Sequence, residues 1–219
     1  MKYEYNPYVR EKFSSDEMIK RSREFNLWME TRRTVREFSP EEIPDEVVGN
    51  IIMAASTAPS GAHKQPWTFC VVRDPEVKKK IRIAAEEEEH ESYTKRMPQD
   101  WLDDLAPFGT DWKKPFLEIA PVLIVVFKRS YEMVGDRKKN NYYVTESVGL
   151  ACGFLLAAIH NAGLVALTHT PSPMNFLADL LERPANEKPF LLIPIGLPSE
   201  GCLVPKLTRK PINEVLTNY

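Results

Sequence analysis

The run at residues 120–127, Ala-Pro-Val-Leu-Ile-Val-Val-Phe, constrains the fold of this chain more than any other stretch. Every residue in it is apolar, so the run has no polar face to turn toward water. A strand that is buried on both faces accommodates that pattern. We therefore expect a central strand, in a sheet that has other elements packed on both of its sides.

Weaker patterns predict the elements around this strand. Further strands are expected at residues 67–73, 164–167 and 190–195, and helices at 14–31, 45–56, from 75 onward, 142–161 and 175–182. Residues 128–141 are expected to form a loop, and the tail from residue 204 to be extended and to lie on another surface, such as a second subunit. Strands separated by helices, with no dinucleotide glycine fingerprint and no P-loop, indicate a layered α/β or α+β domain.

Composition excludes several classes of protein. The 219 residues suffice for one domain with a full core, and a net charge of −2 with interspersed signs does not suggest nucleic acid or an anionic membrane as partner. No apolar run approaches the roughly 20 residues of a membrane span, and the first residues lack a signal-peptide core. Three widely spaced cysteines argue against a disulfide framework or a zinc site. We expect a cytoplasmic protein without a bound metal.

The loop at residues 58–67, between a predicted helix and a predicted strand, is a candidate cofactor site. Pro59 and Pro66 restrict the backbone at its two ends, and Gly61 allows close approach to a flat ligand. A rigid loop with free N–H groups is suited to holding a cofactor. The alternative is an ordinary helix-to-strand turn.

A cluster of arginines precedes that loop. Arg32, Arg33 and Arg36 lie within five residues, beside the hydroxyl of Thr34. Guanidinium groups match phosphate oxygens with paired hydrogen bonds, so the cluster is a candidate phosphate site. The alternative is a solvated helix end at which basic side chains offset the helix dipole.

The glutamate-rich helix that begins near residue 75 is mostly a solvated face, but three of its side chains share one side. Glu86, Glu89 and Tyr93 follow the spacing i, i+3, i+7. Residues 100–114 follow, with Trp101 and Trp112 among charged residues and no strong periodicity. This aromatic-rich segment fits either a closing lid or a weakly amphipathic surface hairpin.

Several short motifs, taken in chain order, resemble the nitroreductase flavoprotein superfamily. They are Arg-Arg-Thr-Val-Arg at residues 32–36, Ala-Pro-Ser at 58–60 with Gln-Pro-Trp at 65–67, Asn-Ala-Gly-Leu at 161–164 and Ile-Gly-Leu-Pro at 195–198. Within it the chain is more similar to the iodotyrosine deiodinase branch, at Thr-Ala-Pro-Ser-Gly-Ala-His (57–63), the glutamates at 86–89 with Tyr-Thr-Lys-Arg-Met (93–97), Thr-Pro (170–171), and Val-Pro (204–205) with Arg-Lys-Pro (209–211).

The resemblance implies an α+β, nitroreductase-like fold with a mixed central sheet flanked by helices. It further implies an intertwined homodimer with two FMN sites at the interface. The chain would then divide into an N-terminal helical arm, residues 1–30, and a single FMN-binding domain, residues 31–219, with a lid at about 90–114.

The FMN-binding residues implied by the resemblance fall into three groups. Those for the phosphate and ribityl chain are Arg32, Arg33, Thr34, Val35, Arg36 and Arg209; those along the flavin are Pro59, Ser60 and Gly61; those at the flavin N5 edge are Thr168, His169 and Thr170. Thr170 matches the catalytic threonine whose hydroxyl donates to N5, which favours one-electron steps. Many nitroreductases carry Asn where His63 stands, so no flavin contact is assigned to His63.

The implied substrate is a halogenated tyrosine. Glu89, Tyr93 and Lys114 match the residues that bind its amino-acid zwitterion, and the backbone N–H of Ala62 matches the donor to its phenolate oxygen. Glu89 can accept from the ammonium, while Lys114 and Tyr93 can bind the carboxylate. Generic nitroreductases lack this set of three side chains, which makes the set the main discriminator.

The implied reaction is FMN-dependent reductive dehalogenation, from 3-iodo-L-tyrosine to L-tyrosine plus iodide, by one-electron steps from reduced flavin. The implied electron donor is NAD(P)H or an electron-transfer protein. Two alternatives stay open: a general NAD(P)H-dependent nitro or quinone reductase on the same scaffold, and a non-catalytic FMN-binding protein.

Overall fold

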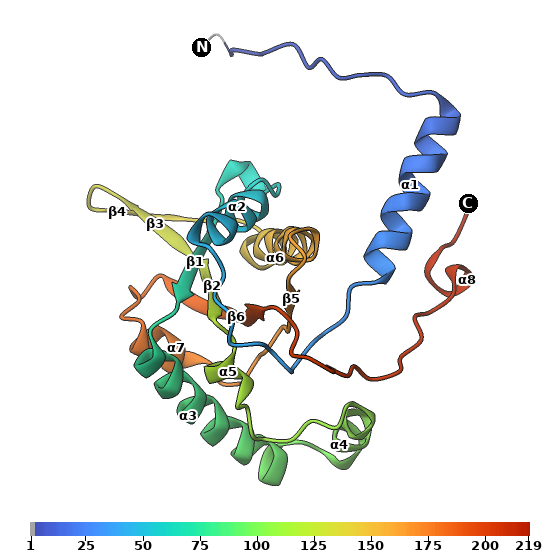
Figure 1. The fold of residues 1–219 in the computed structure, drawn as a ribbon. Coiled ribbons are helices and arrows are strands. Elements are labelled where there is room, and N and C mark those ends of the chain that lie inside the picture. Colours follow the sequence, from blue (N-terminus) through green and yellow to red (C-terminus); the bar gives the residue numbers. More distant parts are fainter. Residues whose placement is uncertain (1–2) are drawn as a thin grey trace. The chain divides into compact units, whose positions relative to one another are not determined.

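The computed structural model describes residues 3–219, which divide into two compact units: one ends at Arg33 and the other runs from Thr34 to Tyr219 (Figure 1). The first unit contains helix α1 (Ser15–Glu30), and no residue of this helix is buried. Its N-terminus is capped as predicted, because the Ser14 hydroxyl accepts from the Glu17 N–H at 3.2 Å. The predicted arm of residues 1–30 and domain of residues 31–219 stay predictions.

The second unit is built on a four-stranded sheet in the order β1-β2-β6-β5. Its strands are β1 (Trp67–Val72), β2 (Val122–Arg129), β5 (Val165–Ala166) and β6 (Glu187–Gly196). All the paired strands are antiparallel, and a parallel bridge between Thr34 and Ala166 makes the sheet mixed. The predicted central strand is confirmed, since β2 lies between two neighbours and residues 122–127 are fully buried.

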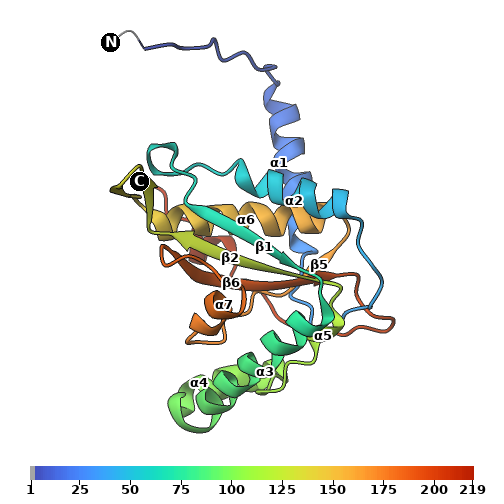
Figure 2. The same cartoon turned by 90° about the vertical axis from the view of Figure 1, so that its left-hand side faces the viewer.

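Alternate side chains of β2 enter two separate cores. Val122, Ile124 and Val126 pack on one side of the sheet, where helices α2 (Asp45–Ser56) and α6 (Val144–Asn161) cover it. Leu123, Val125 and Phe127 pack on the other, with α3 (Pro75–Glu91), α5 (Phe116–Ile119) and α7 (Asn175–Leu180) (Figure 2). This two-sided burial explains why the strand is apolar at every position.

The prediction of a loop at residues 128–141 is wrong. Strand β2 continues to Arg129, and β3 (Tyr131–Val134) and β4 (Arg137–Asn140) form an antiparallel hairpin around Gly135, whose φ is +58°. These strands are half-buried or exposed and carry many charges, so no apolar alternation marks them. Other boundaries shift by a few residues, and the tail contains a short helix, α8 (Ile212–Val215).

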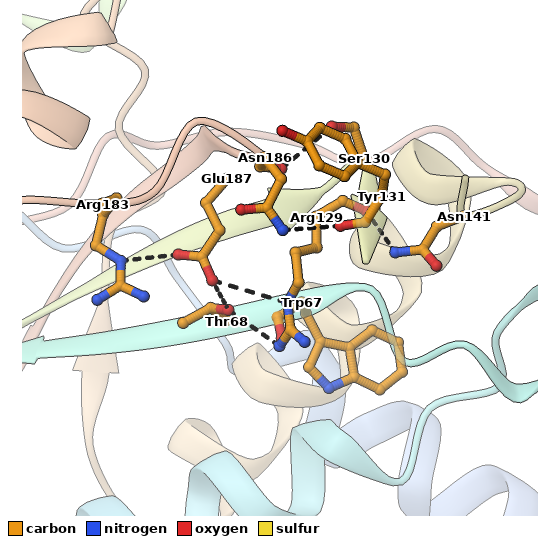
Figure 3. A network of polar contacts seen from close by, with 9 residues as sticks. All are labelled: Trp67, Thr68, Arg129, Ser130, Tyr131, Asn141, Arg183, Asn186 and Glu187. Atoms are coloured by element: carbon orange, nitrogen blue, oxygen red, sulfur yellow. Dashed lines mark hydrogen bonds and ion pairs between the residues drawn. The ribbon is translucent and has the colours of Figure 1, made fainter. Parts of the chain in front are cut away.

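A network of polar contacts ties the base of this hairpin to the sheet (Figure 3). Asn186 donates to the Tyr131 carbonyl at 2.8 Å, and Asn141 donates to the Arg129 carbonyl at 2.9 Å. At its centre, Glu187 on β6 accepts from the Thr68 hydroxyl on β1 at 2.6 Å. The network thereby joins three strands through side chains as well as through the backbone ladder.

Helix α6 is, among residues 3–219, the one that is long and apolar enough to cross a membrane by length and composition. Its residues Val148, Ala151 and Leu155 belong to the core between the sheet and α2. Packing within the domain therefore accounts for one side of this helix, while Leu150 and Phe154 on it stay exposed. The predicted end of this helix is confirmed, since Gly163 follows it with φ +76°.

Candidate functional site

A cavity of about 240 Å³ in the unit from Thr34 to Tyr219 brings two of the predicted groups of site residues together. Its walls include all three side chains predicted to bind a zwitterion: Glu89, Tyr93 and Lys114. They also include four residues predicted to bind a flavin cofactor: Arg36, Thr168, His169 and Thr170. Since these residues come from four separate segments of the chain, the tertiary fold assembles the cavity.

A buried ion pair forms one wall of the cavity. Lys114 Nζ lies 3.3 Å from Glu89 Oε2, with only 4% and 11% of the respective side chains exposed. Burial raises the pKa of Glu89 and lowers that of Lys114, and each partner only partly offsets the effect on the other. The pair therefore presents adjacent negative and positive poles that are themselves largely shielded from water.

The lysine and the tyrosine of this wall also contact the loop that precedes Lys114. Lys114 Nζ donates to the Asp111 carbonyl and, at 3.4 Å, to the Thr110 hydroxyl, and it lies 5.3 Å from the centre of the Tyr93 ring. The Tyr93 hydroxyl donates to the Thr110 carbonyl at 3.4 Å, and burial raises its pKa, so it stays a donor at neutral pH. Both groups can therefore exchange a loop oxygen for a ligand carboxylate.

The segment between Glu91 and Thr110 covers the cavity with helical turns and not with a hairpin. It consists of a π-helical turn (Ser92–Arg96), helix α4 (Gln99–Leu105) and a 3₁₀ turn (Ala106–Phe108). Met97, Trp101 and Leu105 line the cavity at spacings of four residues. Sequence reasoning missed this apolar stripe, although its i, i+4, i+8 spacing is visible between the charged residues.

Three residues after β5 alternate in direction. The backbone of His169 exchanges hydrogen bonds of 2.8 and 3.0 Å with Leu192, so this stretch continues the sheet edge. His169 is buried, whereas Thr168 and Thr170 are exposed. Burial, with the charges of Lys114 and Arg36, lowers the pKa of His169 to about 3, so its imidazole is neutral. The two threonine hydroxyls are the accessible donors of this wall.

Of the predicted phosphate-binding residues, Arg36 lies in the cavity wall. The bridge from Thr34 to Ala166 and a 3.2 Å hydrogen bond from the Val35 N–H to the Ala166 carbonyl fix the chain just before it. Burial lowers the pKa of Arg36, although a guanidinium remains charged. Thr34 and Val35 contribute through their backbone and do not line the cavity. Arg32 and Arg33 belong to the unit that ends at Arg33.

The loop predicted to lie along a flavin has an uncommon backbone. Ala62, His63 and Gln65 have φ of 48°, 54° and 46°, a conformation that non-glycine residues rarely adopt and that is enriched at functional sites. The hydroxyl of Ser60 accepts from the Gln65 N–H at 2.9 Å and braces the turn. A Cβ at Gly61 would lie 2.9 Å from the Tyr143 ring, so here the glycine permits close approach to the protein itself.

Neither this loop nor Arg209 contributes to the cavity walls in the part of the chain that the structure describes. Pro59, Ser60, Gly61 and Ala62 lie at the end of α2, beside the start of α6. A single copy of residues 34–219 thus brings the predicted substrate side chains together with Arg36 and residues 168–170. It does not bring them together with the predicted flavin loop.

Comparison with known proteins identifies the family. The nitroreductase family model matches residues 29–197. The chain belongs to the nitroreductase family. It is 64% identical to an iodotyrosine deiodinase of Haliscomenobacter hydrossis, over 97% of this chain and 96% of the relative. It is 50% identical to that of Hydra vulgaris, over 100% of this chain and 81% of the relative.

A solved structure of oxidized iodotyrosine deiodinase bound to FMN and 3-iodo-L-tyrosine matches the fold with a TM-score of 0.74. The match is 33% identical and covers 89% of this chain and 97% of the other. The predicted α+β nitroreductase fold, a mixed sheet flanked by helices, is therefore confirmed. The ligand-binding roles of the individual residues stay predictions.

Proposed function

We propose that this nitroreductase-family protein is an FMN-dependent reductive dehalogenase that converts 3-iodo-L-tyrosine to L-tyrosine and iodide. The observation that carries the proposal is the buried Glu89–Lys114 pair, which lies with Tyr93 in one cavity with Thr168 and Thr170. A free amino acid carries an ammonium and a carboxylate on neighbouring atoms. The two poles of the pair are complementary to those charges, whereas a simple quinone or nitroaromatic carries no ammonium or carboxylate that could pair with Glu89 or Lys114.

The residues of the cavity fit FMN. Arg36 is half-buried in the wall and has no acidic partner among the described residues, so it is a cation available to an anionic or electron-rich cofactor. The hydroxyl of Thr170 is accessible and would donate to flavin N5. When bound and reduced, FMN would supply the two electrons that, together with a proton, replace the carbon–iodine bond with a carbon–hydrogen bond and release iodide.

The protein's own groups bind and orient the substrate. Glu89 accepts hydrogen bonds from the ammonium, and Lys114 and Tyr93 donate to the carboxylate in place of the Thr110 and Asp111 oxygens. The Ala62 N–H, from the flavin loop of a second copy, would donate to the phenolate oxygen. Met97, Trp101 and Leu105 cover the ring as a lid and exclude water, which strengthens each of these polar contacts.

A homodimer would complete the site. Helix α1 has no buried residue and exposes Met18, Ile19 and Phe25, and α6 exposes Leu150 and Phe154 beside Gly149 and Gly153, which have open space around them. A second copy that covered such apolar faces could bring its own flavin loop to this cavity.

The three cysteines are free thiols, which fits the reducing cytoplasm. NAD(P)H or an electron-transfer protein would supply the electrons.

The test is iodide release. FMN-loaded protein is reduced with dithionite and given 3-iodo-L-tyrosine, and free iodide and tyrosine are measured. Stoichiometric iodide is expected. Tight FMN binding without iodide release would support a non-catalytic flavin protein instead.

A variant separates the proposed enzyme from a general reductase. Glu89→Gln should abolish iodotyrosine binding and leave turnover of a nitroaromatic largely intact, with Glu87→Gln on the exposed side of the same helix as matched control. Equal loss of both activities would indicate a general nitro or quinone reductase without a dedicated zwitterion site.

A further inference from the structure

Helix α3 carries a ladder of charged side chains that faces the segment from Lys114 to Ala120. Its members recur every four or three residues and so share one side of the helix; they are Lys78, Arg82, Glu86 and Glu89. Each makes a polar contact with the facing segment, Lys78 and Arg82 near its C-terminal end and Glu86 and Glu89 at Lys114. The contact at Glu89 belongs to the proposed substrate site, whereas Lys78, Arg82 and Glu86 do not line the cavity.

The lower half of the ladder fixes α5. Lys78 is buried, and its Nζ donates to the carbonyls of Glu118 and Ala120 at 2.9 Å each. The Arg82 guanidinium pairs with the Glu118 carboxylate. These contacts anchor the C-terminal end of the segment to α3, but they lie away from the cavity.

Glu86 fixes the other end of the segment. Its Oε1 accepts from the backbone N–H of Lys114 at 2.7 Å, and its Oε2 pairs with Arg82. The Glu86 side chain is only 15% exposed, so this charge-assisted hydrogen bond to the backbone is protected from water. One turn further along α3, Glu89 meets the ammonium of the same lysine. Two carboxylates of one helix face therefore hold Lys114, one by its backbone and one by its side chain.

We propose that Glu86 is a positioning residue that makes the site selective for free amino acids over simple halophenols. This inference rests on the proposed function. Glu86 does not line the cavity and touches no substrate; it fixes the point from which the long lysine side chain starts. Without that anchor the Lys114 ammonium is positioned only by its side-chain contacts with Glu89, Thr110 and Asp111, and the backbone point from which it extends is no longer fixed. Losses in binding from displacements of about 1 Å are typical of such sites.

Three variants separate the length of the side chain from its charge. Glu86→Ala removes the acceptor, Glu86→Asp keeps the charge but shortens the reach by one methylene, and Glu86→Gln keeps an acceptor oxygen at the same reach. Glu87→Ala, on the exposed side of the helix, is the matched control. KM and kcat are measured on FMN-loaded protein for 3-iodo-L-tyrosine and for 2-iodophenol, and the Kd of iodotyrosine is measured from quenching of flavin fluorescence.

We expect Glu86→Ala and Glu86→Asp to raise Kd and KM for iodotyrosine about tenfold or more, the size of a lost charge-assisted hydrogen bond, with kcat within about threefold. Glu86→Gln should recover most of the affinity, and kcat/KM for 2-iodophenol should not change, since that substrate has no zwitterion. Equal losses for both substrates, or no change in the affinity for iodotyrosine, would overturn the inference.

If Glu86→Ala does not fold, Glu86→Asp and Glu86→Gln still give opposite expected results. The wild-type protein tests the proposed function separately: a wild type that releases no iodide refutes the dehalogenase, whereas a wild type that releases iodide, with unchanged Glu86 variants, refutes only the role of Glu86.

Discussion

Two buried glutamates of this protein are held in opposite ways. Glu187 lies in the polar network of the sheet, where it accepts from Thr68 at 2.6 Å and from Arg183 at 2.8 Å and lies 3.7 Å from Arg129 (Figure 3). Glu89 faces the cavity with Lys114 as its partner, at 3.3 Å. Both carboxylates are largely shielded from water, but only the first has most of its acceptor capacity filled.

The pKa shifts of the two groups express this difference. Burial alone would raise the pKa of Glu187, but the hydrogen bonds from Arg183 and Thr68 and the charges of Arg183 and Arg129 lower it overall. Burial raises the pKa of Glu89, and Lys114 offsets only part of that. A carboxylate with a full set of donors stabilises the fold, while one with too few donors is left able to bind a ligand cation.

The largest expected effect is on stability. Glu187→Ala leaves Arg183 and Arg129 without their shared carboxylate, which should lower the free energy of unfolding by about 3 kcal/mol, since both arginines keep some contact with water. Urea unfolding followed by circular dichroism measures it. A loss below about 1 kcal/mol would mean that the network is no more than a set of surface contacts.

The next effect is on binding. Lys114→Met removes the positive pole of the cavity and should weaken iodotyrosine binding about hundredfold, the effect of losing a charged hydrogen-bond partner. The free energy of unfolding should change by no more than about 1 kcal/mol, because the unpaired Glu89 can take up a proton. Flavin fluorescence quenching and urea unfolding of the same variant test both halves. A destabilisation as large as that of Glu187→Ala would mean that the Glu89–Lys114 pair stabilises the fold as much as the Glu187 network does.

Acidification should separate the two glutamates further. Glu89 must be ionised to bind an ammonium. Because its pKa is raised, iodotyrosine affinity should begin to fall at a pH higher than the pKa of an ordinary glutamate. Below the pKa of Glu89, the affinity should fall about tenfold per pH unit. The pKa of Glu187 is lowered in the folded state, so its stabilising contribution is present above the unfolded value and is lost only as the pH falls through the folded one. Binding should therefore be lost at a higher pH than stability. Simultaneous loss would show that unfolding causes both.

The smallest expected effect comes from Thr68→Val. This variant removes one neutral donor to Glu187 and leaves both arginines in place, so the free energy of unfolding should fall by about 1 kcal/mol. Thermal unfolding against the wild type measures it. An effect equal to that of Glu187→Ala would mean that the hydroxyl, and not the arginines, holds the carboxylate.

Local patterns in the sequence were enough for the scaffold and for many site residues. The apolar run of β2 predicted a central strand, because burial on both faces leaves a direct trace in composition. The i, i+4 spacing of Glu89 and Tyr93 predicted that they share one side of a helix; Glu89 lies in α3 and Tyr93 in the π-helical turn that follows it, and both line the cavity. Family motifs extended this to Lys114 and to residues 168–170, which no periodicity identifies.

Contacts between distant segments were decided by the tertiary structure alone. The β3–β4 hairpin was missed because exposed, charged strands are stabilised by pairing and carry no apolar alternation. Glu86 meets the backbone of a residue 28 positions away, and Glu187 meets a hydroxyl 119 positions away. Composition and spacing report which side chains a helix or strand buries, since that depends on the segment itself. Which donors a buried carboxylate meets depends on how separate segments pack. Those donors distinguish the two glutamates: Glu187 stabilises the sheet, and we propose that Glu89 binds the substrate.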